Sequence, residues 1–163
     1  MATITITSLV TKSEAEICAE IMVGSEPWVT LRRSYTESLK ILTDSNYKVH
    51  LARESGTIVG FIVTEHLGPL NGYIKSICVN PMYRNNGIGT LLMLDAEKRI
   101  FEDTPNVFLM VSDFNHGARR LYQRLGYQEV GVMKDYLIEG SSEILMRKTR
   151  GPLLGYDFHK KDF

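Results

Sequence analysis

The stretch Arg84-Asn85-Asn86-Gly87-Ile88-Gly89-Thr90 lies between an apolar, strand-like run and a helix-like pattern. A glycine-rich turn that joins a strand to a helix favours phosphate, because the first backbone N–H groups of a helix have no partners within it and lie at the positive end of its dipole. The two glycines lack the Cβ atoms that would keep a ligand off the backbone. Arg84 adds a charge suited to phosphate oxygens. The whole stretch therefore predicts an anion-binding loop.

Two phosphate-binding motifs do not fit this loop. A P-loop ends in Gly-Lys-Ser/Thr, whereas Gly89 and not lysine precedes Thr90. The dinucleotide fingerprint needs a third glycine where Leu92 stands. The remaining pattern, Arg-x-x-Gly-x-Gly, also fits an ordinary loop at the start of a helix, so the glycines alone leave both interpretations open.

A second motif lies downstream, where Asn115-His116-Gly117-Ala118-Arg119-Arg120-Leu121-Tyr122 runs into Leu125-Gly126-Tyr127. With both motifs in this order, the chain resembles the GCN5-related N-acetyltransferase (GNAT) superfamily, whose hallmarks are Arg/Gln-x-x-Gly-x-Gly/Ala and Asn-x-x-Ala-x-x-Leu-Tyr-x-x-Leu-Gly-Phe/Tyr. Its pattern is most similar to the ribosomal-protein and N-terminal (Nα) acetyltransferases. The resemblance covers residues 1–149 and leaves 150–163 as a C-terminal extension. It implies an α/β (α+β) fold, with a central mixed, mostly antiparallel sheet of about seven strands flanked by about four helices.

Composition limits the class of protein and its partners. The 163 residues suit one domain. Lys and Arg number 19, as do Asp and Glu, which argues against a nucleic-acid partner. The two cysteines lie among apolar residues and predict buried thiols in a reducing compartment. The N-terminus does not resemble a signal peptide and no run reaches membrane-spanning length, so we expect a cytoplasmic protein without a membrane partner.

Hydrophobic periodicity predicts the order of the helices and strands. Ser13 and Glu16 form a capping-box pattern for the first helix, which Gly24 ends. Residues 107–111 are continuously apolar, which is typical of a strand buried on both faces. The expected order is a strand from 4, a helix from 13 to 24, a helix over 31–42, strands over 47–52, 57–65 and 73–79, a helix over 87–101, a strand over 107–111, a helix from 115, and strands over 127–132 and 143–147. The tail is rich in apolar and aromatic residues, so docking on its own domain or on a second subunit and simple fraying are equal alternatives, and we expect a monomer or a homodimer.

The resemblance implies an acetyl-CoA-dependent N-acetyltransferase in which a primary amine attacks the thioester directly, without a metal. In relatives the glycine loop holds the pyrophosphate of coenzyme A. The pantetheine arm lies along the preceding strand, which maps to Ile77, Cys78 and Val79, and a backbone N–H there would face the thioester oxygen. Asn115 contacts coenzyme A in relatives and also fits a helix N-cap.

Tyr122 is the expected donor of a proton to the departing thiolate, since a phenol with a pKa of about 10 keeps its proton at neutral pH. It also fits the apolar stripe of its own helix, which is the role of most such tyrosines. The base is harder to assign, because Met110 stands where some Nα-acetyltransferases carry Glu or His. Tyr73 matches a second family solution and would order a chain of water molecules. Further candidates, each also readable as a solvated turn residue, are Glu65, His66 and Asp113.

Two aromatic residues are expected on the acceptor side. Trp28 lies in the loop between the first two helices, which touches the substrate in peptide-acetylating relatives, and Tyr136 matches a peptide-contacting tyrosine. Packing is the alternative role for both residues. An α-amine has a pKa of about 8 against about 10.4 for lysine, so it loses its proton with little help. We therefore expect the acceptor to be a primary amine, with a protein or peptide N-terminus ahead of a small-molecule amine. A coenzyme-A-binding sensor without turnover is the alternative from another class.

Overall fold

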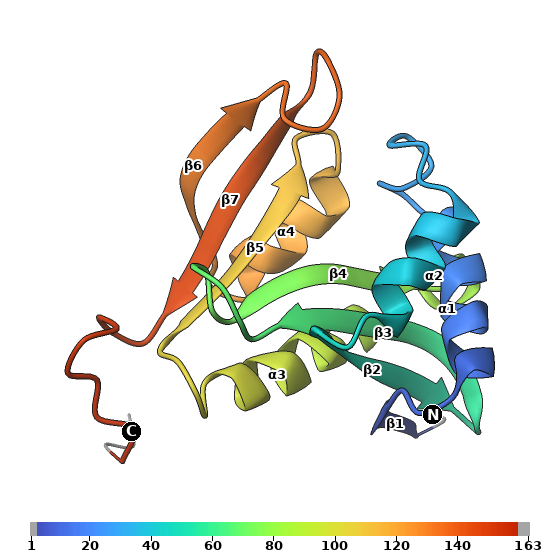
Figure 1. Cartoon of the computed structure of the whole chain (residues 1–163), viewed down its shortest axis with the longest axis horizontal. Helices are drawn as coiled ribbons and strands as arrows, with labels where there is room; N and C mark the ends of the chain where they lie inside the picture. Colours follow the sequence, from blue (N-terminus) through green and yellow to red (C-terminus); the bar gives the residue numbers. More distant parts are fainter. Residues whose placement is uncertain (1–2, 160–163) are drawn as a thin grey trace.

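The computed structural model describes residues 3–159. They form a seven-stranded sheet in the order β1-β2-β3-β4-β5-β7-β6, with α1 and α2 on one face and α3 and α4 on the other (Figure 1). All neighbouring strands are antiparallel except β4 and β5, so the expected mixed sheet with four helices is confirmed. The strands are Ile4–Ser8 (β1), Tyr47–Glu54 (β2), Thr57–Glu65 (β3), Tyr73–Val79 (β4), Asn106–Ser112 (β5), Gln128–Lys134 (β6) and Ser142–Thr149 (β7). The α-helices are Lys12–Val23 (α1), Tyr35–Thr43 (α2), Ile88–Ile100 (α3) and His116–Arg124 (α4), and Pro81–Tyr83 forms a 3-10 turn.

The N-cap of the first helix lies two residues earlier than expected. Thr11 is its N-cap and Glu14 the third helical residue, each side chain accepting a hydrogen bond from the other's backbone N–H. The expected pairing of Ser13 with Glu16 is therefore wrong. The same spacing occurs in both pairs, but Glu14 gains an additional ion pair with Arg53 of β2, which the local pattern could not reveal.

The second helix begins later than expected, at Tyr35 and not near residue 31. Ser34 caps it together with Glu37 in another capping box. Arg32 has a φ of 52°, a left-handed conformation that cannot belong to an α-helix. The segment before Ser34 is therefore a loop that carries Trp28 toward the sheet.

Side chains on the two faces of the sheet form separate cores. In β3, Val59 and Ile62 join the core under α3 and α4, whereas Phe61 and Val63 join the core under α1 and α2. The expectation that β5 is buried on both faces is only half right. Leu109 is buried toward α3 and α4, but Met110 is only half-buried. The opposite face of β5 lines a cavity.

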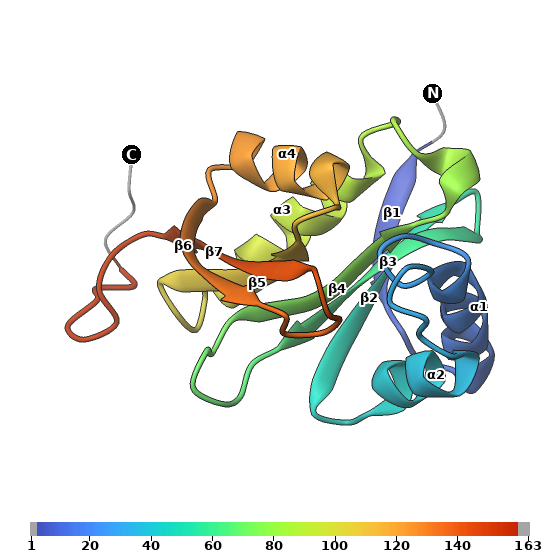
Figure 2. The same ribbon diagram turned by 90° about the horizontal axis from the view of Figure 1, so that it is seen from above.

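The parallel strands β4 and β5 pair only where the beginning of β4 meets the middle of β5, through Tyr73 with Phe108 and Ile74 with Leu109. Beyond that point they diverge, as Figures 1 and 2 both show. β4 also bulges at Lys75, which has no partner in β3 between the pairs Thr64–Ile74 and Val63–Ser76. A bulge increases the local twist and turns a strand away from its neighbour, and here it lies where the separation starts.

The described part of the C-terminal extension follows β7. Arg150 donates its backbone N–H to Pro105 at 2.8 Å, and its guanidinium lies 4.0 Å from the centroid of the Phe101 ring. Farther along, Leu153 and Leu154 are exposed. The start of the extension therefore docks on its own domain, and residues 160–163 lie outside the described residues. Between residues 3 and 159, none of the helices is long and apolar enough to cross a membrane.

Candidate active site

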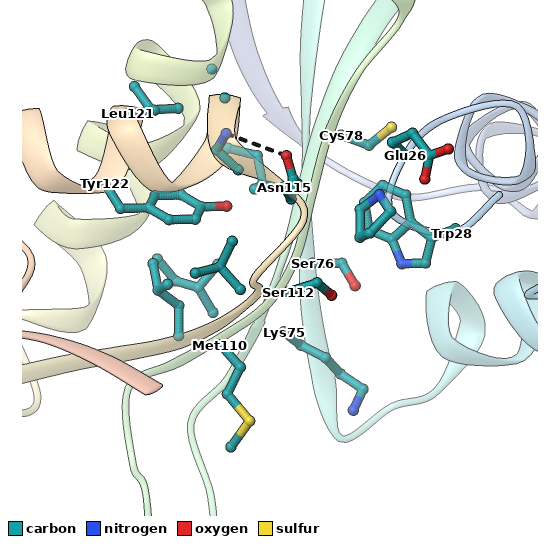
Figure 3. Close-up of a pocket in the computed structure, with 18 of the residues that line it drawn as sticks. Glu26, Trp28, Lys75, Ser76, Cys78, Met110, Ser112, Asn115, Leu121 and Tyr122 are labelled. Atoms are coloured by element: carbon teal, nitrogen blue, oxygen red, sulfur yellow. Dashed lines mark hydrogen bonds between the residues drawn. The ribbon is translucent and has the colours of Figure 1, made fainter. Parts of the chain in front are cut away.

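A cavity of about 970 Å³ opens where β4 and β5 separate. Its walls come from β4, β5, the N-terminus of α3, one side of α4, the start of β7 and the α1–α2, β3–β4 and β6–β7 loops. Figure 3 shows the part formed by β4, β5, α4 and the α1–α2 loop. Most residues expected at the site line it: Trp28, Tyr73, Ile77, Cys78, Val79, Arg84, Asn85, Gly87, Ile88, Gly89, Thr90, Asn115, Tyr122 and Tyr136. Asn86 is not among the lining residues, because its side-chain amide donates to the carbonyl of Tyr83 at 3.2 Å.

The glycine loop leaves the start of α3 free to receive an anion. Gly87 is the N-cap of α3, and no side chain in the described chain caps the helix or places an acid in its first turn. The φ of Gly87 is 78°, a conformation that disfavours a side chain, and nothing lies within 4 Å of where its Cβ would be. Arg84 donates from Nε to the carbonyl of Val79 at 3.1 Å, which holds its guanidinium beside the end of β4. These backbone donors and this cation fit a pyrophosphate.

Among the described residues, the separation of the strands leaves one edge of β4 without a partner strand. Ile77, Cys78 and Val79 pair with β3 on one side, but the β4–β5 ladder has already ended at Ile74. Backbone groups on the open side of β4 therefore face the cavity. An amide-bearing chain such as pantetheine fits there as an added strand.

Tyr122 extends from α4 into this cavity. Figure 3 shows its hydroxyl pointing away from the helix, with Trp28 and Glu26 on the far wall. Burial, followed by the neighbouring Tyr73, raises the pKa of Tyr122 above its ordinary value of 10.0. The phenol therefore keeps its proton at neutral pH. Asn115 caps α4 by accepting a hydrogen bond from the N–H of Ala118 at 3.3 Å, which leaves its amide nitrogen as a donor.

The residues proposed as a base occupy different places. Burial raises the pKa of Tyr73 to about 12, with a further contribution from the carboxylate of Glu143. Glu65 and Met110 also line the cavity. His66 and Asp113 do not: His66 lies 3.0 Å from the hydroxyl of Thr64, and Asp113 accepts hydrogen bonds from residues 141 and 142. The structure thus brings Tyr73 to the cavity and places the last two side chains outside it.

The two aromatic residues of the acceptor side differ in burial. Trp28 is buried, packs in the core under α1 and α2, and also forms part of the cavity wall. Tyr136, in the β6–β7 loop, is 57% exposed and remains free to contact a ligand.

Glu143 is a cavity residue that the sequence did not single out. It is buried, lies on β7, and accepts a hydrogen bond from the hydroxyl of Ser112 at 2.6 Å. The available signal was a glutamate one residue before the apolar run Ile144-Leu145-Met146, since an acid inside a strand pattern is unusual.

Comparisons with known proteins agree with this geometry. A family profile described as "Acetyltransferase (GNAT) family" matches residues 15–127. The chain is also 31% identical over 149 residues to the N-alpha-acetyltransferase RimI of Mycobacterium tuberculosis, covering 86% of this chain and 90% of that protein. The chain belongs to the GNAT acetyltransferase family. It is an acyltransferase that moves the acetyl group of acetyl-CoA to an amine.

Solved structures share the fold of this GNAT enzyme. The ribosomal-protein-S18-alanine N-acetyltransferase from Escherichia coli superposes with a TM-score of 0.74 at 19% identity, covering 95% of this chain and 100% of that one. An aminoglycoside 6'-N-acetyltransferase complexed with coenzyme A has a TM-score of 0.74 at 18% identity, covering 91% and 98%. Acceptors as different as a protein and an aminoglycoside thus occur on one fold, so the acceptor must be argued from the site.

Proposed function

We propose that the acceptor of this GNAT enzyme is the N-terminal amine of a peptide or protein. The observation that carries the proposal is the shape of the acceptor side. A second cavity of about 480 Å³ adjoins the first and shares Leu31, Arg33, Lys75 and Leu137 with it. The two cavities together form an acceptor groove that runs past α2, a shape suited to an extended chain more than to a compact small molecule.

The walls of the acceptor groove support a polypeptide. One wall is the α1–α2 loop with Trp28 and Leu31, and the other is the β6–β7 loop with Tyr136 and Leu137. These apolar and aromatic residues suit the side chains of a peptide, and the second cavity also has charged residues from the α1–α2 loop, α2 and β4 on its walls. The name of the relative from Mycobacterium tuberculosis, an N-alpha-acetyltransferase, points the same way.

Within this proposal the cavity residues take distinct roles. The loop from Arg84 to Thr90 binds the pyrophosphate of coenzyme A, and the open edge of β4 at residues 77–79 binds the pantetheine arm beside Asn115. A backbone N–H of that edge stabilises charge on the thioester oxygen. Tyr122 protonates the leaving thiolate, and Tyr73 orders water on the acceptor side.

The proposal also includes the compartment. Cys18 and Cys78 are buried and free, as is usual in a reducing compartment, and we place the enzyme in the cytoplasm on that basis.

The test compares acceptors by mass spectrometry. A peptide with a free N-terminus and one internal lysine is offered alongside its N-formylated form, spermidine and an aminoglycoside. We expect one acetyl group on the free N-terminus and little on the blocked peptide, because lysine holds its proton more tightly. A kcat/KM for either small amine above that of the peptide would contradict the proposal and favour a small-molecule acetyltransferase. Binding of acetyl-CoA without turnover of any amine would favour a sensor.

A matched pair of variants tests the acceptor groove itself. Leu137→Trp narrows it and is expected to lower kcat/KM for the peptide about tenfold, since one or two apolar contacts are worth this much. Leu153→Trp makes the same change at an exposed site in the C-terminal extension and should leave the peptide rate unchanged. Equal effects of the two substitutions on kcat/KM would contradict the assignment of this groove as the binding site for the acceptor peptide.

A further inference from the structure

The acceptor side of the cavity contains a carboxylate that none of the roles above uses. Glu143 of β7 stands directly opposite Ser112 of β5 in the antiparallel ladder, and the two are joined by the 2.6 Å hydrogen bond from Ser112 Oγ to Glu143 Oε1. Both residues line the cavity. We propose that Glu143 is the base that accepts the proton of the acceptor ammonium group and that Ser112 is its positioning residue. The inference rests on the proposed N-terminal acceptor.

The alternation of side chains places Glu143 on the acceptor side of the sheet. Ile144 and Met146 of β7 point into the core under α3 and α4. Successive residues of a strand point to opposite faces, so Glu143 points the other way. On β5, Leu109 and Val111 join the same core, which leaves Met110 and Ser112 on the face of Glu143. Figure 3 shows Met110 and Ser112 reaching from β5 on the side away from Tyr122.

In this geometry the site does not need a base at position 110. Met110 pairs with Leu145 across the β5–β7 ladder, and the next pair on the same face is Ser112 with Glu143. A carboxylate is therefore present two residues farther along the sheet from Met110, on the neighbouring strand. It stands toward the end of β5 that separates from β4, where the cavity is open.

The burial of Glu143 suggests a role beyond structure. The residue is only 5% exposed, and a buried carboxylate is costly unless a cation or several hydrogen bonds compensate it. Among the described residues, none of the lysines, arginines or histidines lies within 4.0 Å of it. The second carboxylate oxygen is thus available, and an α-ammonium group entering the cavity is a cation of the right size to meet it.

The groups around Glu143 are acidic or neutral. Asp113, after β5, is kept ionised by the N–H of Ser142 and the hydroxyl of Ser141, which lower its pKa. From β6 the paired residue is the uncharged Met133. Tyr73 of β4 and Tyr136 of the β6–β7 loop contribute phenols. The charged residues on other walls of the cavity are Glu26, Arg33, Glu65, Lys75, Arg84 and Arg124.

This environment shifts the pKa of Glu143 in the direction that favours proton transfer. Burial raises its pKa above 4.5, and the charge of Asp113 adds to the rise, while the hydrogen bond from Ser112 opposes it. A base is most effective when its pKa approaches the working pH, and these two effects move a carboxylate in that direction.

The reaction then balances as follows. Glu143 takes one proton from the R–NH₃⁺ group, directly or through one water molecule, and later releases it to solvent. The amine lone pair forms the C–N bond, and the C–S bond breaks. Tyr122 gives its proton to the sulfur and recovers one from the nitrogen. The sum is R–NH₃⁺ plus acetyl-CoA giving the acetamide, free thiol and one H⁺.

The test uses the full-length enzyme and a peptide with a free N-terminus. Glu143→Gln keeps the shape and the hydrogen bond but cannot accept a proton. We expect kcat/KM to fall about 100-fold at pH 7, the usual size of a general-base contribution, and less than about fivefold at pH 9.5. The difference closes because an α-amine with a pKa of about 8 is already unprotonated at the higher pH.

Two further variants separate catalysis from structure. Glu139→Gln changes an exposed carboxylate of the β6–β7 turn and should leave both rates unchanged. Ser112→Ala removes the bond that lowers the pKa of Glu143, so the rising limb of the pH profile should move to higher pH. A purely structural Ser112 would lower the rate without moving that limb.

The possible results are distinct. An undiminished rate for Glu143→Gln at pH 7, or an equal loss at pH 7 and pH 9.5, overturns the role of Glu143. An unshifted profile for Ser112→Ala overturns its positioning role. If the wild type acetylates only small amines, the peptide acceptor is wrong, and the same pH comparison with the accepted amine still decides the role of Glu143.

Discussion

At the scale of single residues, two neighbouring buried tyrosines differ in whether they line the cavity. Tyr122 and Tyr127 pack edge to face with ring centroids 6.0 Å apart, and burial raises the pKa of both. Only Tyr122 lines the cavity, whereas the Tyr127 hydroxyl is buried beside Glu97. A hydroxyl that stays protonated and lines the cavity is suited to protonate a thiolate.

Tyr122→Phe is expected to lower kcat about 100-fold while changing the Kd of acetyl-CoA less than about twofold, because it removes a proton donor and not a binding contact. Steady-state kinetics and calorimetry measure the two quantities. Tyr127→Phe removes the hydroxyl of the neighbouring ring and should leave kcat unchanged. An equal kcat for the wild type and Tyr122→Phe would remove Tyr122 from the mechanism.

At the scale of the elements, the site depends on how β4 enters the sheet. Gly72 precedes β4 with a φ of +88°, and its carbonyl accepts a hydrogen bond from the N–H of Phe108. A Cβ there would lie 2.5 Å from the carbonyl oxygen of Asn106. The only paired part of the β4–β5 interface is therefore a close contact between two backbones, and the strands diverge immediately after it.

Gly72→Ala should lower the free energy of unfolding by about 2 kcal/mol more than Gly56→Ala, measured by urea unfolding at 25 °C. Gly56 has a similar φ of +86°, but nothing lies within 4 Å of its Cβ position. The control thus carries the cost of the left-handed conformation alone. If both variants lost the same free energy of unfolding, the β4 and β5 backbones would be able to move apart at Gly72 without measurable cost.

At the scale of the whole molecule, hydrogen-bonded carboxylates hold helix ends and loops, and two of them, Glu14 and Asp113, join distant parts of the chain. Glu14 accepts N–H groups at the start of α1 and pairs with Arg53 of β2, and these backbone bonds lower its pKa. The pKa of Glu37 is lowered chiefly by the N–H of Ser34. That of Asp113 is lowered chiefly by the N–H of Ser142.

These shifts predict acid sensitivity. A folded-state pKa below the unfolded value stabilises the protein above the unfolded pKa, and that contribution is lost as the pH falls through the folded pKa. We therefore expect Tm to fall between about pH 5 and pH 3. Glu37→Gln should reduce this fall, whereas Glu139→Gln, at an exposed turn, should not. A wild-type Tm that is constant over this range would contradict the assignment.

Glu143 has the opposite effect on the way stability depends on pH. Its pKa is raised in the folded state, so its contribution is present below the ordinary value of 4.5 and is lost as the pH rises through the raised pKa. The site thus retains a carboxylate at some cost to stability near neutral pH, which is common for catalytic groups.

Interactions between residues close in the chain made many of the helices and strands predictable from the sequence. Hydrophobic periodicity predicted β3 and β4 to the residue, and Asn115 was recognised as a helix cap. The N-cap of the first helix was misplaced by two residues, because the choice between two capping boxes depends on Arg53 from another element. The second was predicted too long, because hydrophobic spacing does not show the left-handed turn at Arg32.

The sequence alone determined the order of the elements, the glycine loop and the helix that carries Tyr122, since periodicity, glycine conformation and capping act between residues close in the chain. Only the tertiary structure decided where β4 and β5 separate and that Glu143 faces the same cavity. Glu143 and Ser112 are 31 residues apart, and their contact depends on β7 inserting between β5 and β6. Alternation along a strand shows which residues share a face, but strand order and register decide what that face meets.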